Sequence, residues 1–152
     1  MKTAACGGYS GRSVFGPLLR GEKVTLRPAR ENDAERWVID VADQAIGATG
    51  IHAINWLDAN GTTGIVIGEK ASWGKGYATE AMRLRTRYAF RELNLHKLMT
   101  EVDAGNEASR KALERNGYRT VGIRREQTFR EGKWRDRWLG EVLRADWEKT
   151  QA

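Results

Sequence analysis

The stretch "GIVIGEKASWGKGYATEAM", residues 64–82, places a β-rich run, a glycine loop and the start of a helix in direct succession. The three β-branched residues at 65–67 predict a strand that is buried on both faces. Two glycines flank Lys75, and from Tyr77 onward apolar residues recur at helical spacing. A strand that turns through glycines into a helix is either a plain tight turn or a place where backbone amides bind an anion.

The loop matches neither of the common phosphate-binding motifs. A Walker loop has four residues between its first glycine and its Gly-Lys pair, whereas five residues separate Gly68 from Gly74. Gly76 then stands where that motif needs a hydroxyl. A dinucleotide fingerprint needs a small residue where Thr79 stands, at the opening of a βαβ unit. Two glycines before a helix N-terminus can still turn several amides toward one pyrophosphate, and a glycine turn without a ligand is the alternative.

Composition is typical of one globular, basic domain. The chain has 152 residues, of which 40% are apolar and 30% charged. Lysine and arginine number 26 against 20 acids, and the resulting net charge of +6 suits an anionic partner. The single cysteine, Cys6, excludes an internal disulfide, and no apolar run is long enough to span a membrane. We therefore expect a cytoplasmic protein with a flexible tail at 1–16, one domain at 17–149 and no membrane contact.

Periodicity predicts an α+β domain with a mixed sheet. The three strands joined by short turns, 37–41, 45–56 and 62–68, predict an antiparallel meander, and the helix after them predicts a crossover to a parallel strand. Asn106 is a candidate N-cap of the second helix. The expected strands are 23–28, 37–41, 45–56, 62–68 and 97–102, the helices are 77–93 and 106–117, and 118–129 with 134–143 form a hairpin, while 29–36 is a polar connector and 144–152 a polar end.

The block at 65–118 resembles the GNAT superfamily of acetyl-CoA-dependent N-acetyltransferases. The resemblance rests on "GIVIGEKASWGKGYATEAM" followed by "NLHKLMTEVDAGNEASRKALERNGY". Near the two ends, "VTLRPARENDAERW" and "FREGKWRDRWLGEVLR" resemble the branch of ribosomal-protein N-terminal acetyltransferases and spermidine acetyltransferases. The resemblance covers most of 20–147. It implies a GNAT-like mixed, mostly antiparallel sheet flanked by helices.

The resemblance also implies a site for acetyl-CoA. It assigns the pantetheine arm to the strand with Ile65, Val66 and Ile67, and a backbone amide near Ile67 to the thioester carbonyl. It assigns Asn106 to the same arm and Ser109 to protonation of the leaving thiolate. An ordinary hydroxyl in the first turn of a helix is the alternative for Ser109. The pyrophosphate cradle is assigned to Trp73, Gly74, Lys75, Gly76, Tyr77, Ala78 and Thr79.

Three positions depart from the pattern of that branch. Thr62 stands where relatives often have a glutamate, and a threonine cannot act as a base, so Glu69, Asp58 or a chain of waters would have to compensate. Leu113 stands where many relatives have a tyrosine, which excludes a tyrosine acid. Only eight residues, 29–36, stand where relatives have two helices. We therefore expect an open acceptor side and an apolar patch that favours a homodimer or another partner.

Three functions follow from these observations. The first is acetyl transfer to a primary amine of a small molecule, a peptide or a protein N-terminus. The second, which the departures favour, is a CoA-binding or regulatory module without activity. The third, which the charge favours, is a nucleic-acid or ribosome contact, although no long basic run is present. No metal is required, because His52 and His96 lie far apart without a cysteine cluster. The positive charge disfavours a polycation such as spermidine as acceptor.

Overall fold

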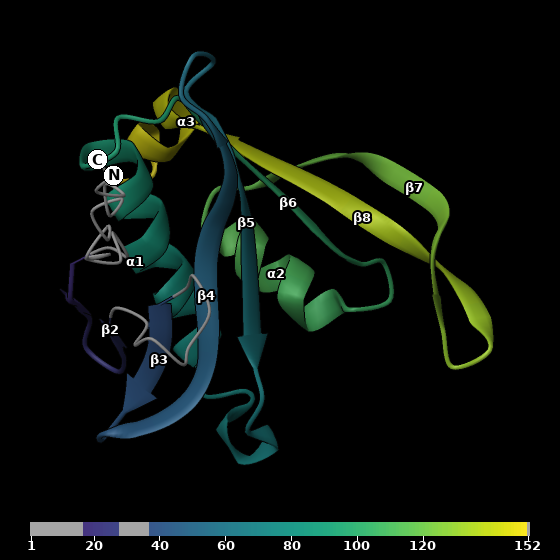
Figure 1. Ribbon diagram of the computed structural model, residues 1–152, viewed down its shortest axis with the longest axis horizontal. Helices are drawn as coiled ribbons and strands as arrows, with labels where there is room; N and C mark the ends of the chain where they lie inside the picture. Colours follow the sequence, from purple (N-terminus) through teal and green to yellow (C-terminus); the bar gives the residue numbers. More distant parts are fainter. Residues whose placement is uncertain (1–16, 28–36, 152) are drawn as a thin grey trace, which may run out of the picture.

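A single sheet of eight strands forms the scaffold of the part of the chain that the computed structural model describes, residues 17–27 and 37–151 (Figure 1). The strands are β1 (Leu19–Arg20), β2 (Thr25–Arg27), β3 (Trp37–Val41), β4 (Gln44–Asn55), β5 (Asn60–Ile67), β6 (Lys97–Asp103), β7 (Arg119–Arg130) and β8 (Lys133–Leu143). The helices are α1 (Tyr77–Arg91), α2 (Glu107–Arg115) and α3 (Arg144–Lys149), with a short 3-10 turn, η1 (Lys70–Ser72), before α1. Across the sheet the order is β1-β2-β3-β4-β5-β6-β8-β7.

The predicted α+β class is confirmed. Every pair of neighbouring strands is antiparallel except β5 and β6, which run parallel, as a crossover through α1 requires. The Asn106 side chain caps α2 by accepting a hydrogen bond from the Ser109 amide at 3.0 Å. The predicted tail at 1–16 and the connector at 29–36, where two helices are expected to be shortened or missing, lie outside the described residues.

The sequence prediction is wrong at the C-terminal end. Residues 144–149 form α3, whereas the polar composition of 144–152 predicts no regular element beyond a frayed turn. Trp147 explains the difference, because its ring is 3% exposed and packs 5.4 Å from the ring of Phe90. Arg91 covers the same indole ring. One buried aromatic residue therefore holds a short helix that local composition does not specify.

The three helices pack on one face of the sheet. Met82 of α1, Leu113 of α2 and Trp147 of α3 belong to one apolar cluster. A second cluster joins α1 to β2, β3 and β4 through Ala81 and Leu84, which belong to the predicted apolar stripe of the helix. Tyr88 of the stripe is half-buried, and burial raises the pKa of its hydroxyl, with a further rise from the Glu92 carboxylate. In Figure 1, α1 and α2 lie behind β4 and β5.

On the opposite face of the sheet, one residue of β5 is more exposed to solvent than predicted. The β-branched run at 65–67 predicts a strand that is buried on both faces, yet Val66 is 60% exposed. Burial along β5 alternates, with Gly61 and Thr63 buried toward the helices. The run is thus a half-buried strand, because the described helices cover only one of its two faces. None of these helices is long and apolar enough to cross a membrane.

Glu80 ties the first turn of α1 to the N-terminal strands. Its side chain is 7% exposed, and its carboxylate accepts hydrogen bonds from three successive amides, those of Glu22, Lys23 and Val24, at 2.7–2.8 Å. These amides belong to the turn between β1 and β2. A carboxylate that accepts several amides satisfies backbone donors that would otherwise be buried without partners. The start of α1 is therefore fixed relative to this turn.

Candidate functional site

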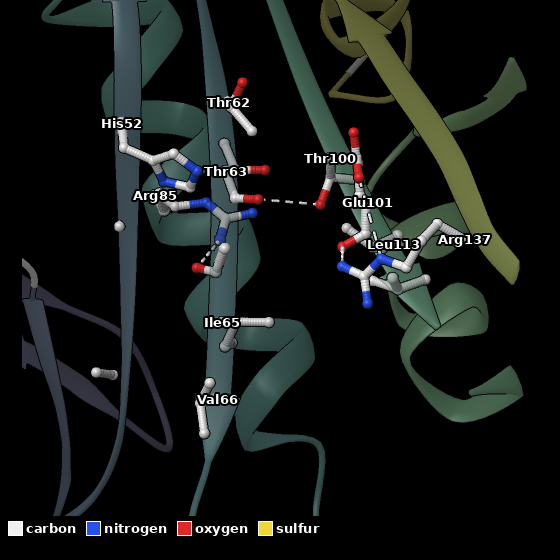
Figure 2. Close-up of a pocket in the computed structure, with 14 residues that line it drawn as sticks. His52, Thr62, Thr63, Ile65, Val66, Arg85, Thr100, Glu101, Leu113 and Arg137 are labelled. Atoms are coloured by element: carbon white, nitrogen blue, oxygen red, sulfur yellow. Dashed lines mark hydrogen bonds and ion pairs between the residues drawn. The ribbon is translucent and has the colours of Figure 1, made fainter. Parts of the chain in front are cut away.

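A cleft of about 500 Å³ lies where β5 and β6 separate (Figure 2). The parallel pairing covers four residue pairs and ends at Thr63 and Thr100. β5 then continues to Ile67 and β6 to Asp103, so no described strand pairs with the edge of β5 that faces β6 from residue 64 onward. The cleft is lined by Ala48, Gly50, His52, Thr62, Thr63, Gly64, Ile65, Val66, Arg85, Thr100, Glu101, Val102, Leu113 and Arg137.

Two threonines fix the point of separation. The Thr100 hydroxyl donates to the Thr63 carbonyl at 3.1 Å, and the Thr63 hydroxyl donates to the Met99 carbonyl at 3.1 Å. The Thr63 hydroxyl also lies 3.2 Å from the hydroxyl of buried Tyr118. Beyond this point β6 remains paired with β8 and follows the long, twisted β7–β8 hairpin away from β5 (Figure 1). The separation of the strands is therefore built into the sheet.

On the face away from the helices, β4 and β5 present His52, Thr62 and Gly64. His52 and Thr62 are partners in the antiparallel register. The His52 ring lies over Gly64, since a Cβ added to that glycine would be 3.5 Å from Cε1 of the imidazole. His52 is exposed and has no hydrogen-bond partner among the described residues. Its ring nitrogens are therefore not engaged by any described residue.

On the helix side, the cleft is lined by Arg85 of α1. This side chain is 1% exposed, and its Nη1 donates to the Thr49 hydroxyl at 2.7 Å and to the Gly64 carbonyl at 2.9 Å. The Nε and Nη2 atoms are also buried, and they have no hydrogen-bond partner within the described ranges. No carboxylate pairs with this guanidinium in the same ranges. A buried positive charge thus lies beside Gly64, and three of its five N–H donors have no partner among the described residues.

The far wall of the cleft carries an ion-paired carboxylate. Glu101 of β6 contacts the Arg124 guanidinium, and Arg137 Nε lies 4.0 Å from its other oxygen. Arg137 Nη2 also donates to the Glu101 carbonyl at 2.9 Å. Figure 2 shows Glu101 and Arg137 together on the β6 side, opposite His52 and Arg85. The carboxylate of Glu101 is therefore occupied by two arginines.

The glycine loop begins where β5 ends. The Trp73 indole N–H donates to the Ile67 carbonyl at 3.1 Å, which fixes the loop to the strand. Gly74 and Gly76 have φ values of 75° and 83°, in the left-handed region that glycine adopts at low cost. A Cβ at Gly74 would meet nothing within 4 Å, so open space lies beside this residue. Gly76 caps α1, which places the positive end of a 15-residue helix at the loop.

A second lysine lies at the loop in addition to Lys75. Lys23 belongs to the turn that Glu80 holds, and its Nζ donates to the Lys75 carbonyl at 3.4 Å. The same Nζ is 3.3 Å from the position of a Cβ at Gly76. Lys75 thus lies within the loop, and the Lys23 ammonium lies beside it at the N-terminus of α1. Such an arrangement suits an anion with several phosphate oxygens.

The structure brings some of the predicted site residues together and leaves others apart. Ile65 and Val66 line the cleft, and Ile67 connects it to the loop. Asn106 and Ser109 do not line the cleft; the Asn106 oxygen is used by the helix cap. The loop residues follow β5 as predicted, with Tyr77, Ala78 and Thr79 in the first turn of α1.

The candidate replacements for the missing glutamate do not reach the cleft either. Glu69 accepts a hydrogen bond from the Ala71 amide, and Asp58 accepts one from Asn55 in the β4–β5 turn. Thr62 itself does line the cleft, so the departure from the family pattern lies at the site. Leu113 lines it as well, at 1% exposure, and offers no hydroxyl there.

Sequence reasoning missed four residues that the structure places at the site: His52, Arg85, Glu101 and Lys23. From the local sequence, each of them is an ordinary residue of a strand, a helix or the surface. Only Arg85 carries a signal in the sequence. It directly follows Leu84 of the apolar stripe and precedes Thr86, so a charged side chain lies next to the predicted buried face of the helix. The others depend on strand register, which brings His52 opposite Thr62 and Glu101 just beyond the last parallel pair.

Comparison with protein families identifies this arrangement. Residues 21–119 match the family model described as the acetyltransferase (GNAT) domain. The chain belongs to this family, as the sequence resemblance predicts. The matched region contains the separated strands, the glycine loop and α1 with its apolar stripe.

Individual relatives support the assignment. Over 81 residues the chain is 40% identical to the probable N-acetyltransferase YjcK of Bacillus subtilis (strain 168), a match that covers 53% of this chain and 45% of that protein. It is 28% identical over 106 residues to the spermidine N(1)-acetyltransferase of Escherichia coli (strain K12), covering 70% and 56%. A solved spermidine N-acetyltransferase from Vibrio cholerae, in complex with CoA and spermine, superposes with a TM-score of 0.69 at 26% identity, covering 74% and 67%. The chain thus spans about half the length of the curated relatives it matches.

Proposed function

We propose that this chain transfers an acetyl group from acetyl-CoA to a primary amine. One observation carries the proposal: β5 has a free backbone edge from residue 64 beside the cleft, and it leads directly into a glycine loop at the N-terminus of α1. Family membership supports it, since the family model is that of an acetyltransferase domain. The relative solved with CoA supports the choice of cosubstrate.

The residues present fit acetyl-CoA. Its pantetheine arm carries amides, which can pair with the unpaired edge of β5 near Ile65 to Ile67 as an added strand would. Its pyrophosphate suits the amides of 74–77, because Gly74 leaves open space and the helix N-terminus favours an anion. Lys75 and Lys23 add positive charge at the same place. Asn106 and Ser109 keep their proposed roles toward the pantetheine arm and the leaving thiolate.

The proposed reaction is a direct attack within a ternary complex. The nitrogen lone pair of a neutral amine attacks the thioester carbonyl carbon, and the carbon–sulfur bond breaks as the amide bond forms. The amine loses one proton, and the sulfur gains one to give the free thiol. An α-amine has a pKa of about 8 and a lysine-type amine about 10.4, so the α-amine loses its proton more readily near neutral pH. This favours a protein or peptide N-terminus as acceptor.

Within this proposal His52 receives the proton of the attacking amine. It lines the cleft, lies over Gly64 and has no competing hydrogen bond among the described residues. Thr62, in the place of the family glutamate, lacks the basicity for the task. Glu101 is engaged by two arginines.

The cradle is tested by replacing Gly76 with aspartate. The carboxylate of Gly76→Asp would lie beside Lys23, neutralise part of the positive charge and repel a pyrophosphate. We expect acetyl-CoA affinity, measured by calorimetry, to fall at least about tenfold, roughly 1.4 kcal/mol of binding free energy. Gly76→Asn is the matched control, since asparagine tolerates the left-handed backbone equally well but carries no charge. Equal affinity of the two variants would refute the phosphate assignment.

Activity is tested separately from binding. Acetyl-CoA consumption is followed over a panel of amines and peptides with free N-termini. Thr62 in the cleft favours the alternative of a CoA-binding or regulatory module, which predicts that CoA raises the melting temperature while no amine is acetylated. Turnover of any acceptor would exclude that module, and silence across the whole panel would exclude the enzyme.

A further inference from the structure

The guanidinium of Arg85 is the feature of the cleft that the proposed acetyl transfer does not use. It is 1% exposed and lines the cleft, yet it forms no ion pair within the described residues. An isolated charge is costly to bury, and proteins retain one where a partner or a function compensates. The two apolar clusters of the core meet near this point, because Ile51 and Ile65 contact both. Among the described residues, this guanidinium therefore has no acidic partner.

The free donors of Arg85 have a defined geometry. Nη1 is used by the Thr49 hydroxyl and the Gly64 carbonyl, whereas Nε and Nη2 have no partner in the part of the chain that the structure describes. Nε and Nη2 form one edge of the planar guanidinium, and their N–H bonds point in the same direction. This is the edge that binds both oxygens of a carboxylate. The two hydrogen bonds from Nη1 hold the plane in place, so the fork is already oriented.

The charge balance of the cleft agrees with an anionic guest. Arg85 and Arg137 contribute two positive charges, and Glu101 is the one acidic residue among the described residues that line the cleft. That carboxylate is already paired with Arg137 and Arg124. A polycation would find no free carboxylate among the described residues of these walls. The relatives named for spermidine thus need not indicate the substrate of this chain.

We propose that Arg85 binds a carboxylate of one of the two reactants in the cleft. The proposal rests on the acyl transfer proposed above and specifies its substrate class. The carboxylate has two possible sources: the far end of a dicarboxylic acyl group on CoA, or an acceptor amine that also carries an acid. In both cases the same bonds form and break, and the products are an N-acyl amine and free CoA thiol.

The experiment compares pairs of reactants that differ only in the acid. Succinyl-CoA and butyryl-CoA have four-carbon acyl groups that end in a carboxylate and a methyl group, respectively. A dipeptide and its C-terminal amide form the acceptor pair, assayed with acetyl-CoA. We expect the full chain to prefer the acid in one of the two pairs, by about tenfold or more in affinity or in kcat/KM. A charged bidentate hydrogen bond gives a preference of this size. The pair that shows the preference identifies the source.

Arg85→Met tests whether this residue is responsible. We expect the variant to lose the preference, with a ratio near one, while acetyl-CoA binds as in the unmodified chain. Its melting temperature should hold or rise, because an unpaired buried charge is replaced by an apolar side chain of similar length. Arg87→Met is the matched control, since Arg87 is an exposed arginine of the same helix and should leave the preference unchanged.

Three outcomes would overturn the proposal. One is acetyl-CoA binding and turnover with no preference for the acid in either pair. Another is a preference that Arg85→Met retains. Both leave the proposed acetyl transfer intact. The third is a chain that binds no acyl-CoA at all, which would remove the proposed function and this inference together. If Arg85→Met does not fold, the comparison within the unmodified chain still decides between the first outcome and the expected one.

Discussion

Gly64 is the residue around which the chemistry of the cleft is organised. Its carbonyl accepts hydrogen bonds from Arg85 Nη1 and from the Thr49 hydroxyl, both at 2.9 Å, on the helix side of the sheet. The ring of His52 lies over its other face. It is also the first residue of β5 beyond the parallel pairing that ends at Thr63. A side chain here would contact the histidine, so glycine keeps the site accessible from both sides.

Replacing His52 with glutamine should lower kcat on the order of 100-fold for a lysine-type amine, because such an amine is mostly protonated near neutral pH and needs a base. The KM for acetyl-CoA should not change, and the defect should shrink as the pH approaches the pKa of the amine. Steady-state kinetics over pH measures both effects. His96→Gln serves as the control, since His96 is equally exposed but does not line the cleft. Unchanged kcat in His52→Gln would remove His52 from the reaction.

At the scale of elements, the loop and helix could be predicted from the sequence, whereas the cleft walls could not. Local chemistry specifies a glycine turn before Tyr77, an asparagine cap at Asn106 and an apolar stripe along α1. Which residues of β4 and β6 face the cleft depends on register, which is set by distant partners. The end of the parallel pairing depends on β6 following β8. His52 and Glu101 are thus recognisable only once the sheet is assembled.

Glu80 links the first turn of α1 to the turn between β1 and β2. Its replacement tests how much this link adds to the stability of the protein. Glu80→Gln keeps the size but leaves one acceptor oxygen and adds two donors that face backbone amides. We expect a loss of about 2–4 kcal/mol in the free energy of unfolding, because charge-assisted hydrogen bonds from a buried carboxylate are lost. Urea unfolding measures it. Glu114→Gln, which breaks an exposed pair with Arg110 on α2, should cost less than about 0.5 kcal/mol. Equal stability of the two variants would contradict the anchoring role.

At the scale of the whole molecule, the β7–β8 hairpin projects away from the rest of the sheet (Figure 1). Its exposed apolar residues include Phe129 and Trp134, at 59% and 60% exposure, whose rings lie 5.2 Å apart. Val121 and Ile123 on β7 are also exposed. These residues are exposed on the hairpin. The apolar patch expected beside the connector at 29–36 is a different surface and stays a prediction. A surface of this kind on a projecting element favours association of two copies.

We predict a homodimer that depends on this aromatic pair. Sedimentation velocity should show a dimer for the unmodified chain and a shift toward monomer for Trp134→Ser. Trp56→Ser is the matched control, because Trp56 is 65% exposed but lies in the turn after β4. A monomer at every concentration, or a dimer that survives Trp134→Ser and is lost in Trp56→Ser, would contradict this placement.

The strand order also determines how the molecule assembles. β1 to β5 are contiguous in the chain and pair with their sequence neighbours, whereas β6 to β8 form a second unit in which β8 lies between β6 and β7. Local pairings close short loops and form early, whereas the parallel junction must wait for the crossover through α1. That junction consists of four residue pairs. The two units are therefore expected to gain structure separately, and the cleft between them comes into existence only in the final step of folding.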